Sequence, residues 1–454
     1  MRSLFVAFCY FSFLAVGIVA PSAFTLGYVW VDSFFPQAIA FEGLFNQLPL
    51  SMIMAIAALG GYLLLDRRDP PRICFMIVLL VLFAAWATIS TFLWAVVPAL
   101  AFVKWNSVVK TLLFAAFIPL AIRSRVQIEA FLQIWLFGFA INFLPGGLKV
   151  LVSGGGYDRN LGISPSGIGA FQVAGDARLA TLALMFVPIM LFLWQHSKIL
   201  PVNWLTSAMY FTMIALAASS AFGTYERTAL IVAAVLAALF WLKSRRKILT
   251  AIALAAAIPI GVFVAPTDWL DRMATITDPH HETSAEHRLD VWSWTFNYAL
   301  EHPLGGGFEV YQIDQLGAAD AAGHRQGMAY HNDFFEVLGE LGWLGLVMFI
   351  GLIATSILYL RGAARRARRL PHLAWCSDLA AALQMALVLQ LTGGSFVALA
   401  FHPPLYMIFA LSISLREYVY RVEKASQRTT IPVSGFATSG FARAADPRPR
   451  FWKA

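Results

Sequence analysis

The sequence has little charge and few cysteines. Only 13% of its 454 residues are charged, whereas 59% are hydrophobic, and the mean hydropathy is +0.70. This balance excludes an ordinary soluble domain. The three cysteines, Cys9, Cys74 and Cys376, lie in or beside apolar runs, and no Cys-x-x-Cys spacing occurs. We therefore predict neither a disulfide framework nor a thiolate metal site.

Signals for metal and for nucleic acid are equally sparse. No two histidines have the His-x-x-x-His spacing of a helical metal site, and the adjacent His280, His281 and Glu282 are weak evidence for one. The net charge of +8 comes from basic residues in short loops between apolar runs, not from a basic patch. We predict no metal, no other cofactor and no nucleic-acid partner.

The chain instead contains many apolar runs of membrane-spanning length. They predict an all-α, polytopic integral membrane protein with about 12 transmembrane helices. We interpret the first run as an uncleaved helix, because a signal peptide would have a shorter core and lead into a polar domain. The runs lie near residues 4–30, 47–65, 73–95, 107–122, 127–145, 178–195, 204–221, 226–242, 248–265, 333–360, 377–398 and 401–416.

Basic residues occur in alternate loops between these runs. Because positive charge favours the cytoplasmic side, this pattern predicts that both termini are cytoplasmic. Segments 146–177 and 266–332 then form two long loops on the outer side. The basic residues on the cytoplasmic side are Arg67, Arg68, Arg72, Arg123, Arg125, Lys198, Lys243, Arg245, Arg246, Lys247, Arg361, Arg365, Arg366, Arg368 and Arg369.

The chain divides into four regions on this interpretation. An N-terminal membrane region, 1–265, holds about nine of the spans and the loop 146–177; the long outer loop 266–332 follows. A C-terminal membrane region, 333–420, precedes a polar segment, 421–454, predicted to be a disordered cytoplasmic tail.

Aromatic residues in the long loop predict one further helix. Trp292, Trp294 and Phe296 suggest a helix lying on the membrane surface, and the segment 303–308, Pro-Leu-Gly-Gly-Gly-Phe, would end it.

The polar cluster Tyr330-His331-Asn332-Asp333 runs directly into an apolar helix. With Asn332 or Asp333 as N-cap, His331 lies at the helix N-terminus, where the helix dipole favours a neutral imidazole and attracts anions. The alternative is a histidine that only caps the helix. Polar groups at a membrane helix are costly, however, and their presence favours a functional site.

Carboxylates at positions 333, 336 and 340 share one face of this helix, since they are spaced i, i+3 and i+7. Glu340 lies inside the apolar zone of the membrane, where a carboxylate needs an arginine or a hydrogen-bond partner. It is a candidate for substrate binding, and a salt bridge that locks two helices is an equal alternative. We expect Gly339, Gly342 and Gly345 to allow close helix packing.

Cations lie near the predicted outer ends of several helices. Arg227 follows Tyr225 at the start of one helix, and Arg288 precedes the tryptophan-rich helix. Arg178 and Lys110 lie near the outer ends of two others. Snorkelling is the alternative for Arg227. Together these side chains could line a pocket for a lipid-linked diphosphate, which planar guanidinium groups bind well.

The segment 331–346 resembles the signature of the O-antigen ligase and polymerase superfamily: His-Asn, apolar residues, then Glu-x-Gly-x-x-Gly-Leu. The upstream Arg288, Trp292 and 303–308 resemble the preceding segment of that family, and 225–227, Tyr-Glu-Arg, resembles its arginine at a helix end.

The first half of the chain is similar to putative O-glycosylation ligases found with exosortase systems. This narrower resemblance rests on Phe35-Pro36, Trp105 with Lys110, Gly146-Gly147-Leu148-Lys149 and Gly154-Gly155-Gly156-Tyr157. Where that group usually has an asparagine pair, this chain has Asp176-Ala177-Arg178.

The resemblance implies a metal-independent, inverting glycosyltransferase of a bacterial inner membrane with its site facing the periplasm. The donor would be an undecaprenyl-diphosphate-linked glycan, and the acceptor a lipid, glycan or protein. His331 would act as catalytic base, with Arg227 and Arg288 on the diphosphate; Lys110, Arg178, Asn332, Glu340 and Tyr225 are candidates for substrate binding.

Two alternatives remain open. An exopolysaccharide repeat-unit polymerase would use the same chemistry on another acceptor. A transporter or flippase of lipid-linked glycans is more remote, because the polar residues gather at the outer edge and no inverted repeat is visible.

Overall fold

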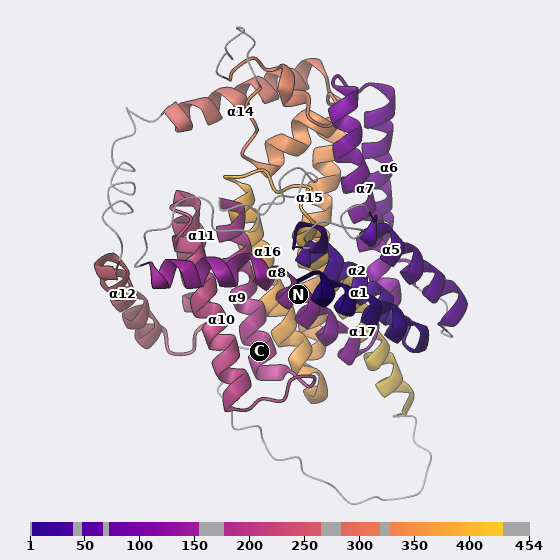
Figure 1. The fold of residues 1–454 in the computed structure, drawn as a ribbon, viewed down its shortest axis with the longest axis vertical. Coiled ribbons are helices and arrows are strands. Elements are labelled where there is room, and N and C mark those ends of the chain that lie inside the picture. Colours follow the sequence, from indigo (N-terminus) through magenta and orange to yellow (C-terminus); the bar gives the residue numbers. More distant parts are fainter. Residues whose placement is uncertain are drawn as a thin grey trace, which may run out of the picture.

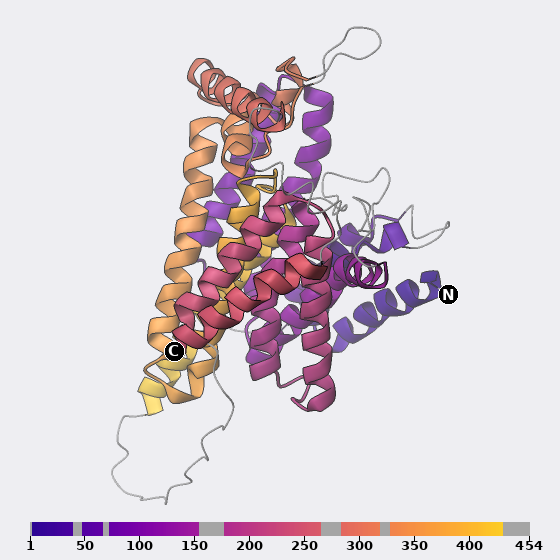
Figure 2. The ribbon, with the colours of Figure 1, turned by 90° about the vertical axis from the view of Figure 1, so that its left-hand side faces the viewer.

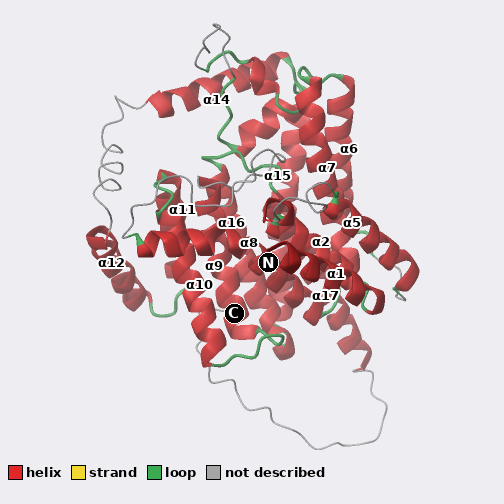
Figure 3. Cartoon of the chain, viewed as in Figure 1, coloured by secondary structure: helices red, strands yellow, loops and turns green. Residues whose placement is uncertain are grey.

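The structure is a computed structural model, and it describes residues 2–39, 48–66, 72–153, 177–264, 283–317 and 327–429. Within these ranges every regular element is a helix, which confirms the predicted all-α class (Figure 3). Of the residues named above, 67, 68, 154–157, 176 and 280–282 lie outside the described residues.

The main helices follow the apolar runs of the sequence. Their bounds are α1 Arg2–Val19, α2 Ser22–Phe34, α3 Pro36–Ile39, α5 Leu50–Gly60 with a π-helical turn Gly61–Leu65, α6 Phe75–Leu93, α7 Pro98–Ala121, α8 Arg125–Val152, α9 Ala177–His196, α10 Trp204–Phe222, α11 Arg227–Lys243, α12 Lys247–Val264, α14 Thr283–Glu301, α15 Asp333–Ala367, α16 Ala374–Gly394 and α17 Pro403–Thr429.

Seven helices in the described part of the chain are long and apolar enough to cross a membrane. They are α6, α7, α8, α9, α10, α15, and α16 with the turn before it. The chain is thus a multi-pass membrane protein, and the predicted total of about 12 spans stays a prediction.

Several predicted helix bounds were wrong. The run 4–30 is two helices, because Pro21 lacks the N–H needed to continue α1 past Val19. Helix α7 starts at Pro98, not near 107, and proline suits the first turn of a helix.

Two helices also continue beyond their predicted ends. Helix α8 continues to Val152, into the predicted loop 146–177, and α17 continues to Thr429, into the predicted tail 421–454.

Helix α9 lies at the centre of the bundle. Nearly all of its side chains are buried, and it packs against α8, α10, α11 and α16. Aromatic rings fill its contact with α8: Phe186 of α9 lies between Trp135, Phe139 and Phe143. Figure 1 shows these helices together in the lower part of the molecule, with α14 across its top.

Helix α14 lies across the ends of the long helices (Figures 1 and 2). It is the helix predicted from Trp292, Trp294 and Phe296, and it ends at Glu301, before Pro303. Its apolar side chains pack against α15: Phe296 lies edge-on to Trp343, whose indole Nε1 donates to the carbonyl oxygen of Ala299.

Helix α15 is broken at Gly342, where φ is 66° and ψ is −168°. The break frees backbone groups, and the loop after α14 satisfies them. The Gly306 and Gly307 amides donate to the carbonyl oxygens of Gly339 and Glu340, and the Trp343 amide donates to that of Pro303. The expectation that Gly342 serves close helix packing is therefore corrected: it permits a left-handed backbone.

Candidate functional site

His331 immediately precedes α15, as predicted. The side chain of Asn332 caps the helix: its Oδ1 accepts from the Phe334 and Phe335 amides at 2.9 and 3.3 Å. Its Nδ2 donates to the carbonyl oxygen of Ser395, at the end of α16. This cap fixes the start of α15 against the 395–402 loop, so Asn332 holds His331 in place from the C-terminal side.

The backbone of His331 is left-handed, with φ at 48°. This conformation costs a non-glycine residue about 1–2 kcal/mol, so contacts on both sides must hold it. On the N-terminal side, Trp292 Nε1 donates to the Tyr330 carbonyl oxygen at 2.8 Å, and the Trp292 ring stacks on Phe335 at 5.3 Å. Trp292 thus ties α14 to both flanks of His331.

Arg288 was predicted to precede the tryptophan-rich helix, but α14 begins at Thr283 and includes it. Arg288 lies one helical turn before Trp292, so both side chains share a face. Burial and the nearby guanidinium groups of Arg288 and Arg178 lower the pKa of His331 to about 4. The imidazole is therefore neutral at physiological pH, as predicted, although burial is the main cause and not the helix dipole. The structure brings His331, Arg288 and Arg178 together.

A second histidine near Arg178, the fully buried His402, was missed by sequence reasoning. It lies in the loop between α16 and α17, just before Pro403. Burial, together with Arg178, lowers its pKa to about 3. The signal was available, because a histidine directly before an apolar helix is the pattern that singled out His331.

Arg227 begins α11, and Tyr225 precedes it with a left-handed backbone, φ 57°. Helices α9, α10 and α11 alternate in direction through short links, so the starts of α9 and α11 lie at the same end of the bundle. Arg227 thus shares its end of the bundle with Arg178. A direct approach of Arg227 to His331 stays a prediction.

Lys110 lies in the middle of α7 with an exposed side chain, because the helix starts nine residues before the predicted bound near 107. Its position near an outer helix end was therefore wrong. Six residues earlier, Lys104 is buried and points to α15. Sequence reasoning missed Lys104, which carries the only charge in the first half of α7.

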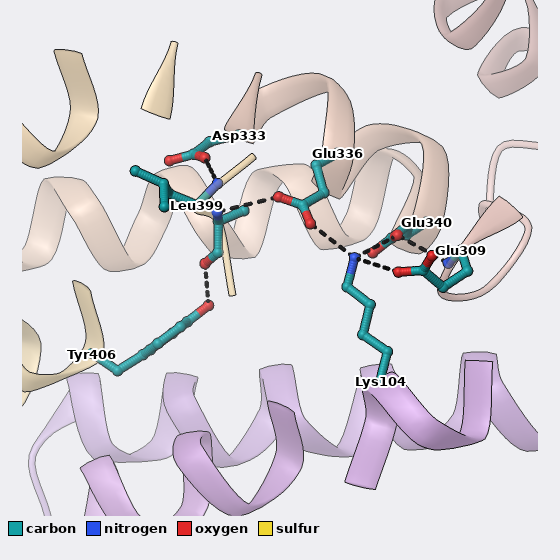
Figure 4. A network of polar contacts seen from close by, with 8 residues as sticks. Lys104, Glu309, Asp333, Glu336, Glu340, Leu399 and Tyr406 are labelled. Atoms are coloured by element: carbon teal, nitrogen blue, oxygen red, sulfur yellow. Dashed lines mark hydrogen bonds and ion pairs between the residues drawn. The ribbon is translucent and has the colours of Figure 1, made fainter. Parts of the chain in front are cut away.

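Lys104 is the centre of a buried ion cluster (Figure 4). Its Nζ lies 2.8 Å from Glu336 Oε1, 2.7 Å from Glu340 Oε1 and 3.4 Å from Glu309 Oε1. Glu340 also accepts from the Glu309 amide at 2.9 Å. This geometry favours the alternative in which Glu340 belongs to a salt bridge that locks helices together.

The other carboxylates of α15 hold the loop before α17. Asp333 Oδ1 accepts from the Leu399 amide at 2.6 Å, and Glu336 Oε2 from the Ala400 amide at 3.2 Å. The carbonyl oxygen of Ala400 accepts from the Tyr406 hydroxyl (Figure 4). The predicted carboxylate face therefore joins α15 to α7 and to this loop. These contacts fix the position of the start of α15, and with it the position of His331.

Among the described residues, no group of three or more histidine, cysteine or acidic side chains could hold a metal ion. The candidate site thus consists of a neutral imidazole, guanidinium groups and a scaffold of ion pairs. Such a set can accept a proton and bind a diphosphate.

Two parts of the chain match known protein families. Residues 212–350, which include Arg227, Arg288 and His331, match the family described as O-antigen ligase. Residues 1–198 match a family of unknown function (DUF5935), and no curated protein matches the chain. The chain is a multi-pass membrane protein, and its residues 212–350 are similar to the O-antigen ligase family.

Proposed function

We propose that the protein transfers a glycan from an undecaprenyl-diphosphate-linked donor to an acceptor hydroxyl at the periplasmic face of a bacterial inner membrane. The family match supports a lipid-linked glycan as substrate. The single observation that carries the proposal is the neutral, half-buried imidazole of His331 beside the cations Arg288 and Arg178.

His331 is the proposed catalytic base. Its imidazole takes the proton from the acceptor hydroxyl, whose oxygen attacks the anomeric carbon of the donor. The bond from that carbon to the diphosphate oxygen breaks, and undecaprenyl diphosphate leaves. Attack from the face opposite the leaving group inverts the anomeric carbon. The imidazole then passes this proton to solvent and returns to its neutral form.

Arg288 and Arg227 are the proposed diphosphate ligands. A guanidinium binds phosphate oxygens in a bidentate manner, and it stabilises the negative charge that develops as the carbon–oxygen bond breaks. Arg178 and Asn332 complete the site. We assign Glu340 and Lys104 a structural role beside the site, because their charged groups form an ion pair with each other.

The test is a single-turnover assay with purified protein, a lipid-linked glycan and a candidate acceptor. Wild type is expected to release undecaprenyl diphosphate in the presence of a chelator. His331→Ala should lower the rate about 10²–10⁴-fold, the range of general-base catalysis. His302→Ala is the matched control, because His302 is exposed at the end of α14. Full turnover by His331→Ala would remove His331 from the base role.

The acceptor separates a ligase from a polymerase. Deletion of the gene in its host should either remove a glycan from its lipid or protein carrier or leave single repeat units unpolymerised. The first outcome identifies a ligase and the second a polymerase. Loss of donor from the outer leaflet without loss of transfer activity in vitro would identify a transporter instead.

A further inference from the structure

A cleft of about 580 Å³ opens at the far end of α15 from His331. It lies between the C-terminal turns of α15 and α17, which meet there although 54 residues separate Arg369 from Glu423 in sequence. Its lining residues are Gly362, Arg365, Arg366, Arg369, Tyr420, Glu423, Lys424 and Gln427. A volume of this size holds a small polar ligand.

Positive charge dominates the lining of this cleft. Arg365, Arg366, Arg369 and Lys424 contribute four cations, and Glu423 is the one acid among the lining residues. Glu423 lies 3.5 Å from Arg366. The other three cations face the same space, where an anion placed between them would relieve their mutual repulsion.

Aromatic and hydrogen-bonding contacts orient part of this lining. The guanidinium carbons of Arg72 and Arg366 lie 4.6 and 5.7 Å from the ring centre of Tyr420. Arg72 also hydrogen bonds to the Tyr420 hydroxyl, and this bond lowers the pKa of the phenol. Arginine stacked on an aromatic ring is held with its N–H groups at the ring edge, in a position to meet phosphate oxygens.

Gly362 lines the cleft with no side chain of its own. A Cβ added there would meet no atom within 4 Å. A larger side chain at this position would therefore enter the space without displacing protein atoms.

The preference of basic residues for the cytoplasmic side accounts for their number at this end, but not for their convergence from two helices on one cleft. We propose that this cleft binds a phosphate ester, supplied either by the headgroup of an anionic phospholipid or by a free phosphate compound. This site is independent of the glycan-transfer site.

The experiment measures binding to the purified full chain in detergent by native mass spectrometry. The probes are dihexanoyl phosphatidylglycerol, its phosphatidylcholine counterpart, and glycerol 3-phosphate as competitor. We expect preferential binding of phosphatidylglycerol. The double variant Arg365→Gln/Arg369→Gln should weaken it about tenfold or more, the effect of losing two charge-assisted contacts. Gly362→Leu should weaken it comparably by filling the cleft.

Arg361→Gln is the matched control, because Arg361 is an exposed cation of the same helix that does not line the cleft. It should change binding less than about twofold, as surface charges outside a site do. Competition by glycerol 3-phosphate would identify a free phosphate ester as sufficient, and its absence would identify the lipid headgroup. Equal loss in Arg361→Gln, unchanged binding in Gly362→Leu, or no preference for the anionic lipid would overturn the proposal.

Discussion

At the scale of single residues, His331 combines a left-handed backbone with a half-buried ring beside two arginines. The strain is maintained by neighbours that have other structural duties: Asn332 caps α15 and Trp292 ties α14 to Tyr330. Strained residues held in this way are common at functional sites. This supports a catalytic role for His331 over a role in capping alone.

The pH dependence of activity follows from the pKa of His331. An imidazole with the ordinary pKa of 6.5 would lose its basic form below that pH, whereas His331 stays neutral down to about pH 4. We expect kcat/KM, which reports the free enzyme, to stay level through pH 6.5 and to fall only nearer 4. A pH–rate profile with its acidic limb at 6.5 would contradict this.

The same shift affects stability with a definite sign. Below pH 6.5 the unfolded chain protonates His331, but the folded chain does so only near pH 4. Unfolding therefore takes up a proton in this window, so the contribution of His331 to stability falls as the pH drops from 6.5 to 4.

Arg288→Lys tests the requirement for a planar cation. We expect kcat/KM to fall about 10²-fold, because a point charge lacks the bidentate fork that supports the leaving diphosphate. The same direction is expected for Arg227→Lys. Asp290→Asn, an exposed change two residues along α14, is the control. If kcat/KM of Arg227→Lys equals that of the wild type, then Arg227 snorkels to the membrane surface and does not bind the diphosphate.

At the scale of elements, the break in α15 and the loop after α14 form one unit. Gly305 and Gly342 both have positive φ, and each lies against the backbone of the other. The signature glycine Gly342 and the segment 303–308 are thus two sides of a single backbone contact. This contact sets the angle between the part of α15 before Gly342 and the part after it.

Gly342→Ala should destabilise the protein. The new Cβ would overlap the Pro303 carbonyl oxygen and require a positive φ, which costs about 1–2 kcal/mol before any overlap is counted. We expect a lower midpoint of thermal unfolding in detergent. Gly362→Ala, on the same helix with open space around it, should be neutral or stabilising. Equal midpoints for the two variants would refute the role of the break.

Lys104→Met should be more damaging, because it leaves Glu336 and Glu340 buried without their cation. Removing one partner of a buried ion pair costs about 3–5 kcal/mol. Lys110→Met removes an exposed cation of the same helix and should change the unfolding midpoint little. The double variant Lys104→Met/Glu340→Met should recover part of the loss, and no recovery would argue against this pairing.

At the scale of the whole molecule, the two ends differ in chemistry. His331 and the ion cluster lie toward one end of α15, and the arginine-rich cleft lies at the other. Helix α15 itself connects these two ends. If the basic end is cytoplasmic, as the sequence predicts, then the candidate site faces the opposite side of the membrane.

Cysteine labelling tests this orientation. In a background without the three native cysteines, His302→Cys should react with an impermeant maleimide when only the outer membrane is permeable. Arg361→Cys should react only after the inner membrane is opened. Both positions are exposed in the structure. The reverse pattern would invert the proposed topology and place the candidate site in the cytoplasm.

The sequence alone determined what depends on local pattern. Apolar runs gave the helices, since helices satisfy their own backbone in lipid. A cap at Asn332 or Asp333, a helix around Trp292–Phe296 and its end before Pro303 were likewise predicted, because caps and terminators act within a few residues. The start of that helix at Thr283 was not predicted. The neutral state of His331 was predicted too, although from the helix dipole and not from burial.

Only the tertiary structure decided which distant groups meet. Lys104 and Glu340 are 236 positions apart, and no local pattern pairs them. From the sequence, Gly342 was wrongly predicted to serve helix packing. Its positive φ depends on the loop that covers it, and the sequence does not show that contact. The cleft between α15 and α17 was missed for the same reason: the convergence of its lining residues arises only when separate helices pack together.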